Sequence, residues 1–331
     1  MTKPKVLQIL PMYHPNGEKV LREGAEVFQT NLYDIPHLCE CVKGVEAIVL
    51  RAPAKITKEV IDANPNIKVI SGAGVGLDNI DVEYATKKGI LVLHAPSVNK
   101  VSTAEHAIML IMALAKNVIP MHEEMKKGNY DSRNTIPSRE LKGKKVGLIG
   151  FGNIAQEVAR RLKLGFEMEV TAWVREYKPE KHGIAEEIGI HINTNMEEVF
   201  SDADFVSLHI PLNEHTRKSI DSKLFKLMKP SAYLINTARG AIINQEDLYL
   251  ALKEHYLAGA GLDVFEPEPP AKDLPLLSLP NVIVTPHVGG TTVECNYIMS
   301  TTVAENVIKT LNGEKPDYIG NPELLKSKML E

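Results

Sequence analysis

The sequence predicts an α/β protein built from two doubly wound parallel sheets, and three observations support this prediction. Short apolar runs alternate with amphipathic helical stretches along most of the chain. The strand-like runs are continuously apolar, which indicates parallel strands covered by helices on both faces. The chain has 331 residues, more than one compact core usually contains, so two domains are expected.

The first unit is expected to contain five strands. They are VLQIL from residue 6, EVFQT from 26, AIVL from 47, VISG from 69 and ILVLH from 90. Helical stretches, such as residues 57–63 and 82–88, lie between them. This alternation is that of one doubly wound unit.

The second unit follows a long helical pattern from Thr103 to about Lys127, which Gly128 ends, and then a polar segment with no clear period. We expect a sheet of six strands there. They are KVGLIG from residue 145, EVTAWV from 169, FVSLHI from 205, YLINTA from 233, GAGLDVF from 259 and NVIVTPH from 281. The last helical stretch, residues 293–311, is expected to pack on the first unit.

Composition and charge argue against several classes of function. The formal net charge is -4, and no basic stripe is present that would bind nucleic acid. The apolar stretch 107–115 is too short to span a bilayer, and we expect neither a signal peptide nor a membrane partner. The three cysteines, Cys39, Cys41 and Cys295, favour a cytoplasmic location, and no Cys or His cluster has metal-ligand spacing, so no metal is expected.

A glycine-rich turn in KVGLIGFGNIAQEVARRL has the pattern G-x-G-x-x-A, with a strand before it and a helix after it. Gly150 permits the tight turn, Gly152 lets backbone N–H groups approach a pyrophosphate, and Ala155 lets the helix pack on the strand. Asn153 and Ile154 begin the helix, whose positive end would bind the phosphates. The pattern predicts a dinucleotide site; the alternative is an ordinary strand-to-helix turn.

The end of the second strand of this unit, in EVTAWVREYKPE, indicates the cofactor. Dinucleotide folds commonly place an acidic residue there to bind the adenosine ribose. Here Val174 ends the strand and Arg175 follows. Because arginine offers a forked donor to phosphate, this favours NADP over NAD. The alternative is that Arg175 is a solvated loop residue and Glu176 contacts the ribose.

Three ionisable residues fall at the ends of successive strands of the second unit, where α/β sheets bind ligands. Arg239 is the second-last residue of YLINTARG, Glu268 the second-last residue of GAGLDVFEPEP, and His287 ends NVIVTPH. Reversible carbonyl reduction beside a nicotinamide needs such a set. Histidine exchanges the proton near neutral pH, a carboxylate fixes its ring, and an arginine clamps the substrate carboxylate.

Each of these residues also has a structural interpretation. His287 could be a core histidine at a strand end, Glu268 a solvated turn residue and Arg239 the partner of a structural ion pair. All three structural interpretations would have to hold at once, and with a dinucleotide loop upstream this is harder to accept than any one of them alone.

Seven motifs follow one another along almost the whole chain. They are IKVISGAGVGLDNID (67–81), NKVSTAEH (99–106), GLIGFGNIA (147–155), DFVSLHIPLNEHTR (204–217), NTARG (236–240), LDVFEPEP (262–269) and TPHVGG (285–290). In these motifs the chain resembles the D-isomer-specific 2-hydroxy acid dehydrogenase family.

The resemblance implies that Arg239, Glu268 and His287 are the catalytic residues. It also implies that the cofactor is NAD(P), with Asp263 near the nicotinamide carboxamide. The cofactor contacts that it implies are Thr103, Gly150, Gly152, Asn153, Ile154, Val174, Arg175, His209, Pro211, Thr216, Thr237, Ala238, Asp263 and Gly289.

The resemblance further implies two domains with a cleft between them. Residues 1–98 plus 291–331 would form a flavodoxin-like substrate domain, and residues 99–290 a Rossmann domain that binds NAD(P). A homodimer is implied through the cofactor domain, including the long helix that starts near Ser102. The chain departs from the family in two ways: it has Val174 where NAD-preferring members usually have Asp, and it stops near residue 331, without the regulatory domain of some phosphoglycerate dehydrogenases.

The implied substrate is a small 2-hydroxy or 2-keto acid. The backbone of Gly74, Val75 and Gly76 matches the loop that binds the substrate carboxylate. Arg51 matches a position where phosphoglycerate dehydrogenases often have an arginine, and a further cation would suit a second anionic group. The alternative is a surface arginine, so hydroxypyruvate and glyoxylate stay open as substrates.

Two other functions are compatible with such a fold. One is a dinucleotide-sensing transcriptional corepressor, although the chain has no basic region. The other is a formate dehydrogenase of the same superfamily, which would need a glutamine paired with the histidine, where this chain has Glu268. We therefore expect an NAD(P)-dependent D-2-hydroxy acid dehydrogenase that resembles either phosphoglycerate dehydrogenases or hydroxypyruvate/glyoxylate reductases.

Overall fold

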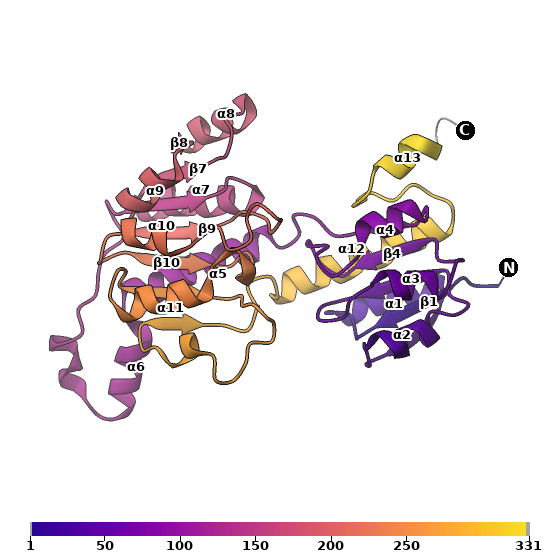
Figure 1. Ribbon diagram of the computed structural model, residues 1–331, viewed down its shortest axis with the longest axis horizontal. Helices are drawn as coiled ribbons and strands as arrows, with labels where there is room; N and C mark the ends of the chain where they lie inside the picture. The colour runs from indigo at the N-terminus through magenta and orange to yellow at the C-terminus, as the bar shows by residue number, and fades with distance from the viewer. Residues whose placement is uncertain (1, 329–331) are drawn as a thin grey trace. The chain divides into compact units, whose positions relative to one another are not determined.

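The computed structural model describes residues 2–328, and the chain divides into two α/β units (Figure 1). Unit 1 consists of Met1–Asn99 and Thr291–Glu331, and unit 2 of Lys100–Gly290. The chain therefore enters unit 2 at residue 100 and returns to unit 1 at residue 291.

Unit 1 contains five parallel strands in the order β2-β1-β3-β4-β5, which confirms the predicted strands. They are β1 (Lys5–Ile9), β2 (Glu26–Thr30), β3 (Ala47–Leu50), β4 (Val69–Gly72) and β5 (Leu91–Leu93). In β3 all four residues are buried, because alternate apolar side chains pack on opposite faces of the sheet. The order reverses between β1 and β3, so the loops after these two strands leave at the topological switch point.

Helices cover both faces of this sheet. On one face are α2 (Ile35–Cys41), α3 (Lys58–Asp62) and α4 (Val82–Lys87), and on the other are α1 (Pro15–Gly24) and α12 (Val293–Leu311). In the sequence, α12 is followed by the short helix α13 (Glu323–Lys328). Glycines let α1 and α12 approach closely. A Cβ atom on Gly17 would lie 2.5 Å from the carbonyl oxygen of Ser300, and one on Gly24 would lie 2.6 Å from Cδ1 of Ile308.

Unit 2 contains seven parallel strands in the order β12-β11-β10-β9-β6-β7-β8, one more than the six predicted. They are β6 (Lys145–Ile149), β7 (Glu169–Trp173), β8 (His191–Asn193), β9 (Phe205–Leu208), β10 (Tyr233–Asn236), β11 (Gly259–Leu262) and β12 (Val282–Val284). The missed strand is β8. It has three residues, lies at the sheet edge and contains a single apolar side chain, so it lacks the apolar run that marks the others.

Helices also cover both faces of the second sheet. On one face are α5 (Lys100–Ala115), α7 (Asn153–Phe166) and α8 (Pro179–Ile188), and on the other are α9 (Met196–Asp202), α10 (Ser222–Leu227) and α11 (Gln245–Lys253). The short 3-10 helices η1 (Tyr130–Asn134), η2 (Gly240–Ile242) and η3 (Pro275–Ser278) lie in loops. In α7 the apolar residues Ala155, Val158, Ala159 and Leu162 recur every three or four positions and are buried.

The single long helix expected from Thr103 to Lys127 is instead two helices. The helix α5 ends at Ala115, and α6 (Val118–Lys126) continues after a bend of 60° (Figure 1). The break lies at Asn117, whose backbone is left-handed with φ of 50°, a conformation that asparagine tolerates better than most residues. Within the described residues, no single helix has both the length and the apolar character to span a membrane, although α5 and α6 together meet those criteria.

Candidate active site

Two of the three predicted catalytic side chains are in direct contact in unit 2. Arg239, Glu268 and His287 follow β10, β11 and β12, three neighbouring strands of one parallel sheet. Nδ1 of His287 lies 2.7 Å from Oε2 of Glu268. The charge of Arg239 also acts on the Glu268 carboxyl group. The strand order therefore gathers at one sheet edge residues that are up to 48 positions apart in the sequence.

The Glu268 carboxylate is held on both oxygens. Oε1 accepts a hydrogen bond from the Phe265 N–H at 2.9 Å, and Oε2 faces the His287 ring. Burial alone would raise the pKa of this carboxyl, but the hydrogen bonds from His287 and Phe265 and the charges of His287 and Arg239 together hold the pKa below its ordinary value. Glu268 is thus a carboxylate, and it fixes the ring of His287 through Nδ1. No described residue bonds to Nε2, which is therefore accessible to a ligand.

The turn that carries Arg239 is built by two residues for which the sequence indicated no role. The buried Asn236 donates from Nδ2 to the carbonyl of Arg239 at 3.0 Å, and its Oδ1 accepts from the N–H of Ala238 at 3.0 Å. Gly240 lies so close to the next loop that a Cβ atom would be 2.0 Å from the carbonyl carbon of Phe265. This close approach joins the Arg239 turn to the Glu268 turn.

The glycine-rich turn has the shape that a pyrophosphate needs. Gly150 has φ of 103°, and a Cβ atom there would lie 2.7 Å from the carbonyl oxygen of His209, so only glycine fits. Gly152 precedes α7, and a Cβ atom on it would meet no atom within 4 Å. The N-terminus of α7, at Asn153 and Ile154, follows this turn directly, and helix N-termini are sites that bind phosphates.

Two buried hydroxyl groups at predicted cofactor positions also fit a bound ligand. Oγ1 of Thr103 and Oγ1 of Thr237 are buried and have no hydrogen-bond partner among the described residues. Buried polar atoms are normally paired, so each of these atoms is available to a polar group of the cofactor.

The remaining predicted cofactor residues lie in the loops after β7, β9, β10 and β12. The side chain of Val174 is buried in the apolar core, whereas Arg175 and Glu176 are exposed. Thr216 closes the loop after β9 by donating to the carbonyl of Pro211 at 2.7 Å. Ala238 lies in the Asn236 turn, and the N–H of Gly289 donates to Asp263.

His209 follows β9 directly and has a strongly shifted protonation equilibrium. Burial lowers the pKa of its imidazole from 6.5 to about 4. Its Nε2 lies 2.9 Å from Oγ of Ser207. The ring is therefore neutral at physiological pH.

Asp263 anchors the loop that carries His287. Its carboxylate is only 1% exposed, and it accepts hydrogen bonds from the N–H groups of Val288 and Gly289, each at 2.9 Å, and from the hydroxyl of Thr285. Burial would raise its pKa, but these bonds and the contact with His106 hold it below the ordinary value. The sequence motifs contained His106 and Thr285 without indicating these contacts.

The predicted substrate loop of unit 1 exposes three backbone donors. After β4, the carbonyl of Gly74 accepts from the Ala95 N–H at 2.9 Å, and the carbonyl of Val75 lies 3.0 Å from Nδ1 of His94. Among the described residues, no backbone acceptor faces the N–H groups of Gly74, Val75 or Gly76. Successive free N–H groups of this kind form a binding site for anions.

Arg51 follows β3 and has no acidic partner among the described residues. Its guanidinium carbon lies 4.8 Å from the centre of the Tyr13 ring, and its Nε is buried without a hydrogen-bond partner among those residues. Tyr13 is in the loop after β1, so both side chains lie at the topological switch point of the unit 1 sheet. Sequence reasoning did not identify Tyr13, because a lone tyrosine in a loop carries no motif.

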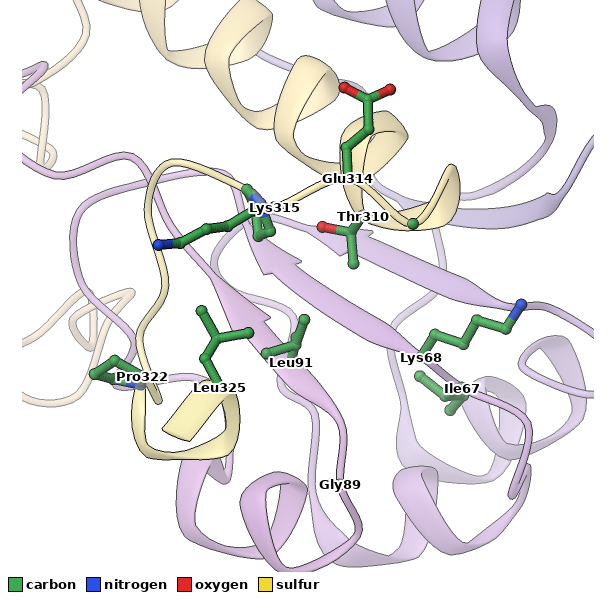
Figure 2. A pocket seen from close by; sticks show the side chains of 11 residues that line it. Ile67, Lys68, Gly89, Leu91, Thr310, Glu314, Lys315, Pro322 and Leu325 are labelled. Carbon is green, nitrogen blue, oxygen red and sulfur yellow. The ribbon is translucent and has the colours of Figure 1, made fainter. Parts of the chain in front are cut away.

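A separate cavity of about 690 Å³ lies in unit 1 (Figure 2). Ile67 and Gly89, which line it, precede β4 and β5, so it is at the amino ends of these strands, opposite the edge where α/β sheets bind ligands. Figure 2 shows the ammonium groups of Lys68 and Lys315 pointing to opposite sides of it. We therefore do not include this cavity in the candidate active site. Within residues 2–328, no three His, Cys, Asp or Glu side chains are grouped as metal ligands.

Comparison with known proteins identifies relatives of the chain. Residues 108–289 match the family model described as "D-isomer specific 2-hydroxyacid dehydrogenase, NAD binding domain". A D-3-phosphoglycerate dehydrogenase of Methanocaldococcus jannaschii is 40% identical over 326 residues, which are 98% of this chain but 61% of that protein. A glyoxylate reductase of Pyrococcus furiosus is 39% identical over 333 residues, covering 98% of this chain and 97% of that protein.

A solved structure is also similar. It is an NADPH-dependent glyoxylate/hydroxypyruvate reductase of Sinorhizobium meliloti in complex with NADP and malonate. The TM-score is 0.85 and the identity 26%, and the match covers 96% of this chain and 97% of that one.

Proposed function

The chain belongs to the D-isomer-specific 2-hydroxyacid dehydrogenase family, and on that premise we propose a reaction and a role for each site residue. It is an NAD(P)-dependent oxidoreductase that interconverts a D-2-hydroxy acid and the corresponding 2-keto acid. The observation that carries the proposed roles is the 2.7 Å contact between Glu268 and His287 at the strand ends of unit 2.

His287 is the proton donor in the reductive direction. When NAD(P)H is bound, its nicotinamide supplies a hydride to the carbonyl carbon. The electron pair of the C=O π bond moves to the oxygen, which takes the proton from Nε2 of His287. Glu268 holds the ring by Nδ1, and its negative charge stabilises the charged imidazole that gives up this proton. Oxidation of the hydroxy acid runs through the same positions in reverse.

Arg239 binds the substrate. Its planar guanidinium offers paired donors to a carboxylate and places positive charge where the carbonyl oxygen becomes negative. The Asn236 turn and the close approach at Gly240 fix the backbone from which Arg239 projects, so the guanidinium is preorganised for this task.

Unit 1 binds the anionic groups of the substrate. The three free N–H groups of Gly74, Val75 and Gly76 suit a carboxylate. Arg51 supplies a cation that no described carboxylate neutralises, which favours a substrate with a second anionic group. We therefore propose phosphohydroxypyruvate as the preferred keto acid, ahead of hydroxypyruvate and glyoxylate.

NADP is the proposed cofactor. Val174 has no polar atom in its side chain to bind a ribose hydroxyl, and the exposed Arg175 is free to bind a 2′-phosphate. The NADP-bound relative from Sinorhizobium meliloti supports this proposal by analogy. In Arg175→Ala, we expect the preference for NADPH to fall by about tenfold, the equivalent of about 1.4 kcal/mol. An unchanged ratio of kcat/KM for NADPH and NADH would show that Arg175 does not select the cofactor.

A keto-acid panel tests the function as a whole. Purified protein is assayed with phosphohydroxypyruvate, hydroxypyruvate and glyoxylate, each with NADPH and NADH. Arg51→Gln should lower kcat/KM for phosphohydroxypyruvate by about tenfold or more, with hydroxypyruvate affected little, because one charged contact is lost. An equal loss for both substrates would reject the role of Arg51, and no turnover with any substrate would reject the enzyme assignment. Neither the family model nor the relatives named above supports the corepressor alternative.

We also propose that the chain forms a homodimer through α5 and α6. Large apolar side chains are exposed on these helices at Val101, Met109, Val118, Ile119 and Met125. Exposed apolar side chains that form a contiguous patch mark surfaces that bind other proteins, and we propose that these five side chains form such a patch. Sedimentation should give a dimer for the wild type and a monomer for Ile119→Glu, and a wild-type monomer would contradict the proposal.

A further inference from the structure

We propose that His106 is a positioning residue for the catalytic histidine, an inference that rests on the proposed function. His106 is in α5, with a side chain only 14% exposed. Its Nε2 lies 2.9 Å from Oγ1 of Thr285 and 3.3 Å from Oδ1 of Asp263. It therefore contacts both residues that hold the loop of His287, whereas the hydrogen bond that holds the His287 ring comes from Glu268.

The loop needs such support because its backbone is in an uncommon conformation. His287 has φ of 54°, in the left-handed region that non-glycine residues rarely adopt. A residue persists there only when its surroundings enforce it. The enforcing contacts are the His287 N–H, which donates to the Asp263 carbonyl at 2.8 Å, and the Val288 and Gly289 N–H groups, which donate to the Asp263 carboxylate.

His106 completes this set of contacts from the side of α5. The Thr285 hydroxyl donates to Oδ1 of Asp263, so its own oxygen accepts the Nε2–H of His106. Asp263 is a buried carboxylate, and removing one of its donors leaves it undercompensated in a place that water reaches poorly. We expect the carboxylate then to shift, and the loop that it binds to shift with it.

The His106 ring lies near the loop that follows His287. A Cβ atom on Gly289 would lie 3.0 Å from Oδ2 of Asp263 and 3.5 Å from the His106 ring. A methyl-sized space therefore separates the ring from the backbone of the loop two residues after His287. His106 contributes mainly a donor, so a substitution that keeps a donor at the place of Nε2 should preserve the loop.

The position of His106 in the chain adds a reason for this arrangement. It comes six residues after the chain enters unit 2 at Lys100, and Thr285 comes five residues before the chain leaves at Gly290. The contact between them joins, inside unit 2, the first and last segments of that unit. The loop that carries His287 is therefore fixed to the helix that begins the unit.

Two polar substitutions of similar size test the proposal. In His106→Gln the amide nitrogen reaches the place of Nε2, whereas in His106→Asn the donor is too short to reach Thr285. Keto-acid reduction should fall by about 10- to 100-fold in kcat for Asn, because a displaced catalytic group costs that much, and should stay within about threefold of wild type for Gln. KM for the nicotinamide cofactor should change little in both variants.

The separate effects on kcat and KM distinguish positioning from a merely structural role. In His106→Asn, kcat should fall while KM for the nicotinamide cofactor stays near the wild-type value, because the loop that carries His287 is displaced while the fold that binds the cofactor is kept. Wild-type kcat in His106→Asn would overturn the proposal, as would an equal loss of kcat in both variants. An inactive wild type would instead show that the proposed function is wrong, so the two failures are distinguishable.

Discussion

At the residue scale, the proposed chemistry depends on one contact, between Nδ1 of His287 and Oε2 of Glu268. The contact keeps Nε2 as the nitrogen that meets the substrate, and the lowered pKa of Glu268 keeps the carboxylate charged down to acidic pH. Because its folded pKa is depressed, Glu268 stabilises the fold above its ordinary pKa, and this contribution is lost as the pH falls through the folded value.

Replacing His287 by alanine should remove the proton donor without disturbing the substrate clamp. We expect kcat for keto-acid reduction to fall by about 10²- to 10⁴-fold, the usual contribution of a general acid, with a small change in KM. The exposed His191 offers the control, since His191→Ala should have wild-type kinetics. A His287→Ala enzyme that stays active with an unchanged pH profile would show that another group donates the proton.

Gly240 should be intolerant of any side chain. In Gly240→Ala the new Cβ would overlap the carbonyl carbon of Phe265, so the Arg239 and Glu268 turns must separate. We expect the free energy of unfolding to fall by about 1–3 kcal/mol, as in other overpacked sites, and kcat/KM to fall as well. Gly165→Ala in α7, where a Cβ meets no atom within 4 Å, should instead raise stability by up to about 1 kcal/mol. If urea denaturation gave the same change in the free energy of unfolding for both variants, the predicted clash at Gly240 would be refuted.

The sequence was informative about these residues only where their chemistry differs from that of the core around them. An arginine, a glutamate and a histidine after apolar strands stand out, and the structure brings Glu268 and His287 into contact. Gly240 and Asn236 look like ordinary turn residues. The importance of Gly240 lies in its close approach to Phe265, 25 positions away, which follows from the strand order of the sheet and leaves no local pattern. The importance of Asn236 lies in two hydrogen bonds within the Arg239 turn, which the residue type alone does not indicate.

At the element scale, the contact between α1 and α12 is one of the contacts that join the two segments of unit 1. Gly17 is the closest point, since a Cβ there would lie 2.5 Å from the Ser300 carbonyl oxygen, and backbone atoms do not move aside easily.

We expect Gly17→Ala to lower the free energy of unfolding by about 1–3 kcal/mol, through overpacking of these helices. Gly183→Ala in α8, which has open space around the new Cβ, is the matched control and should be neutral or stabilising. Chemical denaturation of both proteins gives the comparison. If Gly17→Ala is as stable as Gly183→Ala, the glycine is not required for the helix contact.

Most elements could be predicted because each has a strong periodic signal over several residues. The predicted segment 293–311 is the helix α12, and the five strands of unit 1 are found where expected. The predictions that failed concern short stretches of the chain. The strand β8 has only one apolar residue, and the break between α5 and α6 depends on a single left-handed residue, Asn117, inside an otherwise continuous helical pattern. Short edge strands and single backbone dihedrals carry too little sequence signal to be recognised.

At the scale of the whole molecule, both units follow one rule, in which residues for ligands sit at the carboxyl ends of parallel strands. In unit 2 these are Arg239, Glu268 and His287, and in unit 1 Arg51 and the loop at Gly74. The long-range order of the strands, rather than any local segment, therefore sets the geometry of the candidate ligand-binding residues within each unit.

The stability of the whole chain should depend on pH through His209. Its pKa is about 4 when folded and 6.5 in the reference state, so between these values the unfolded chain binds one proton more than the folded one. The free energy of unfolding is therefore not lowered by this group above pH 6.5. It decreases as the pH falls from 6.5 toward 4, with a slope of up to about 1.4 kcal/mol per pH unit.

Urea denaturation at a series of pH values between 4.5 and 7 measures this slope for the wild type and for His209→Gln. Glutamine keeps a polar group near Ser207 but does not titrate, so the slope of the variant should be smaller by up to one proton, whatever its overall stability. The difference isolates His209 because every other titrating group is common to both proteins. Parallel curves would mean that the folded state binds a proton on this ring as readily as the unfolded chain does, and His209 would then not be held neutral by burial.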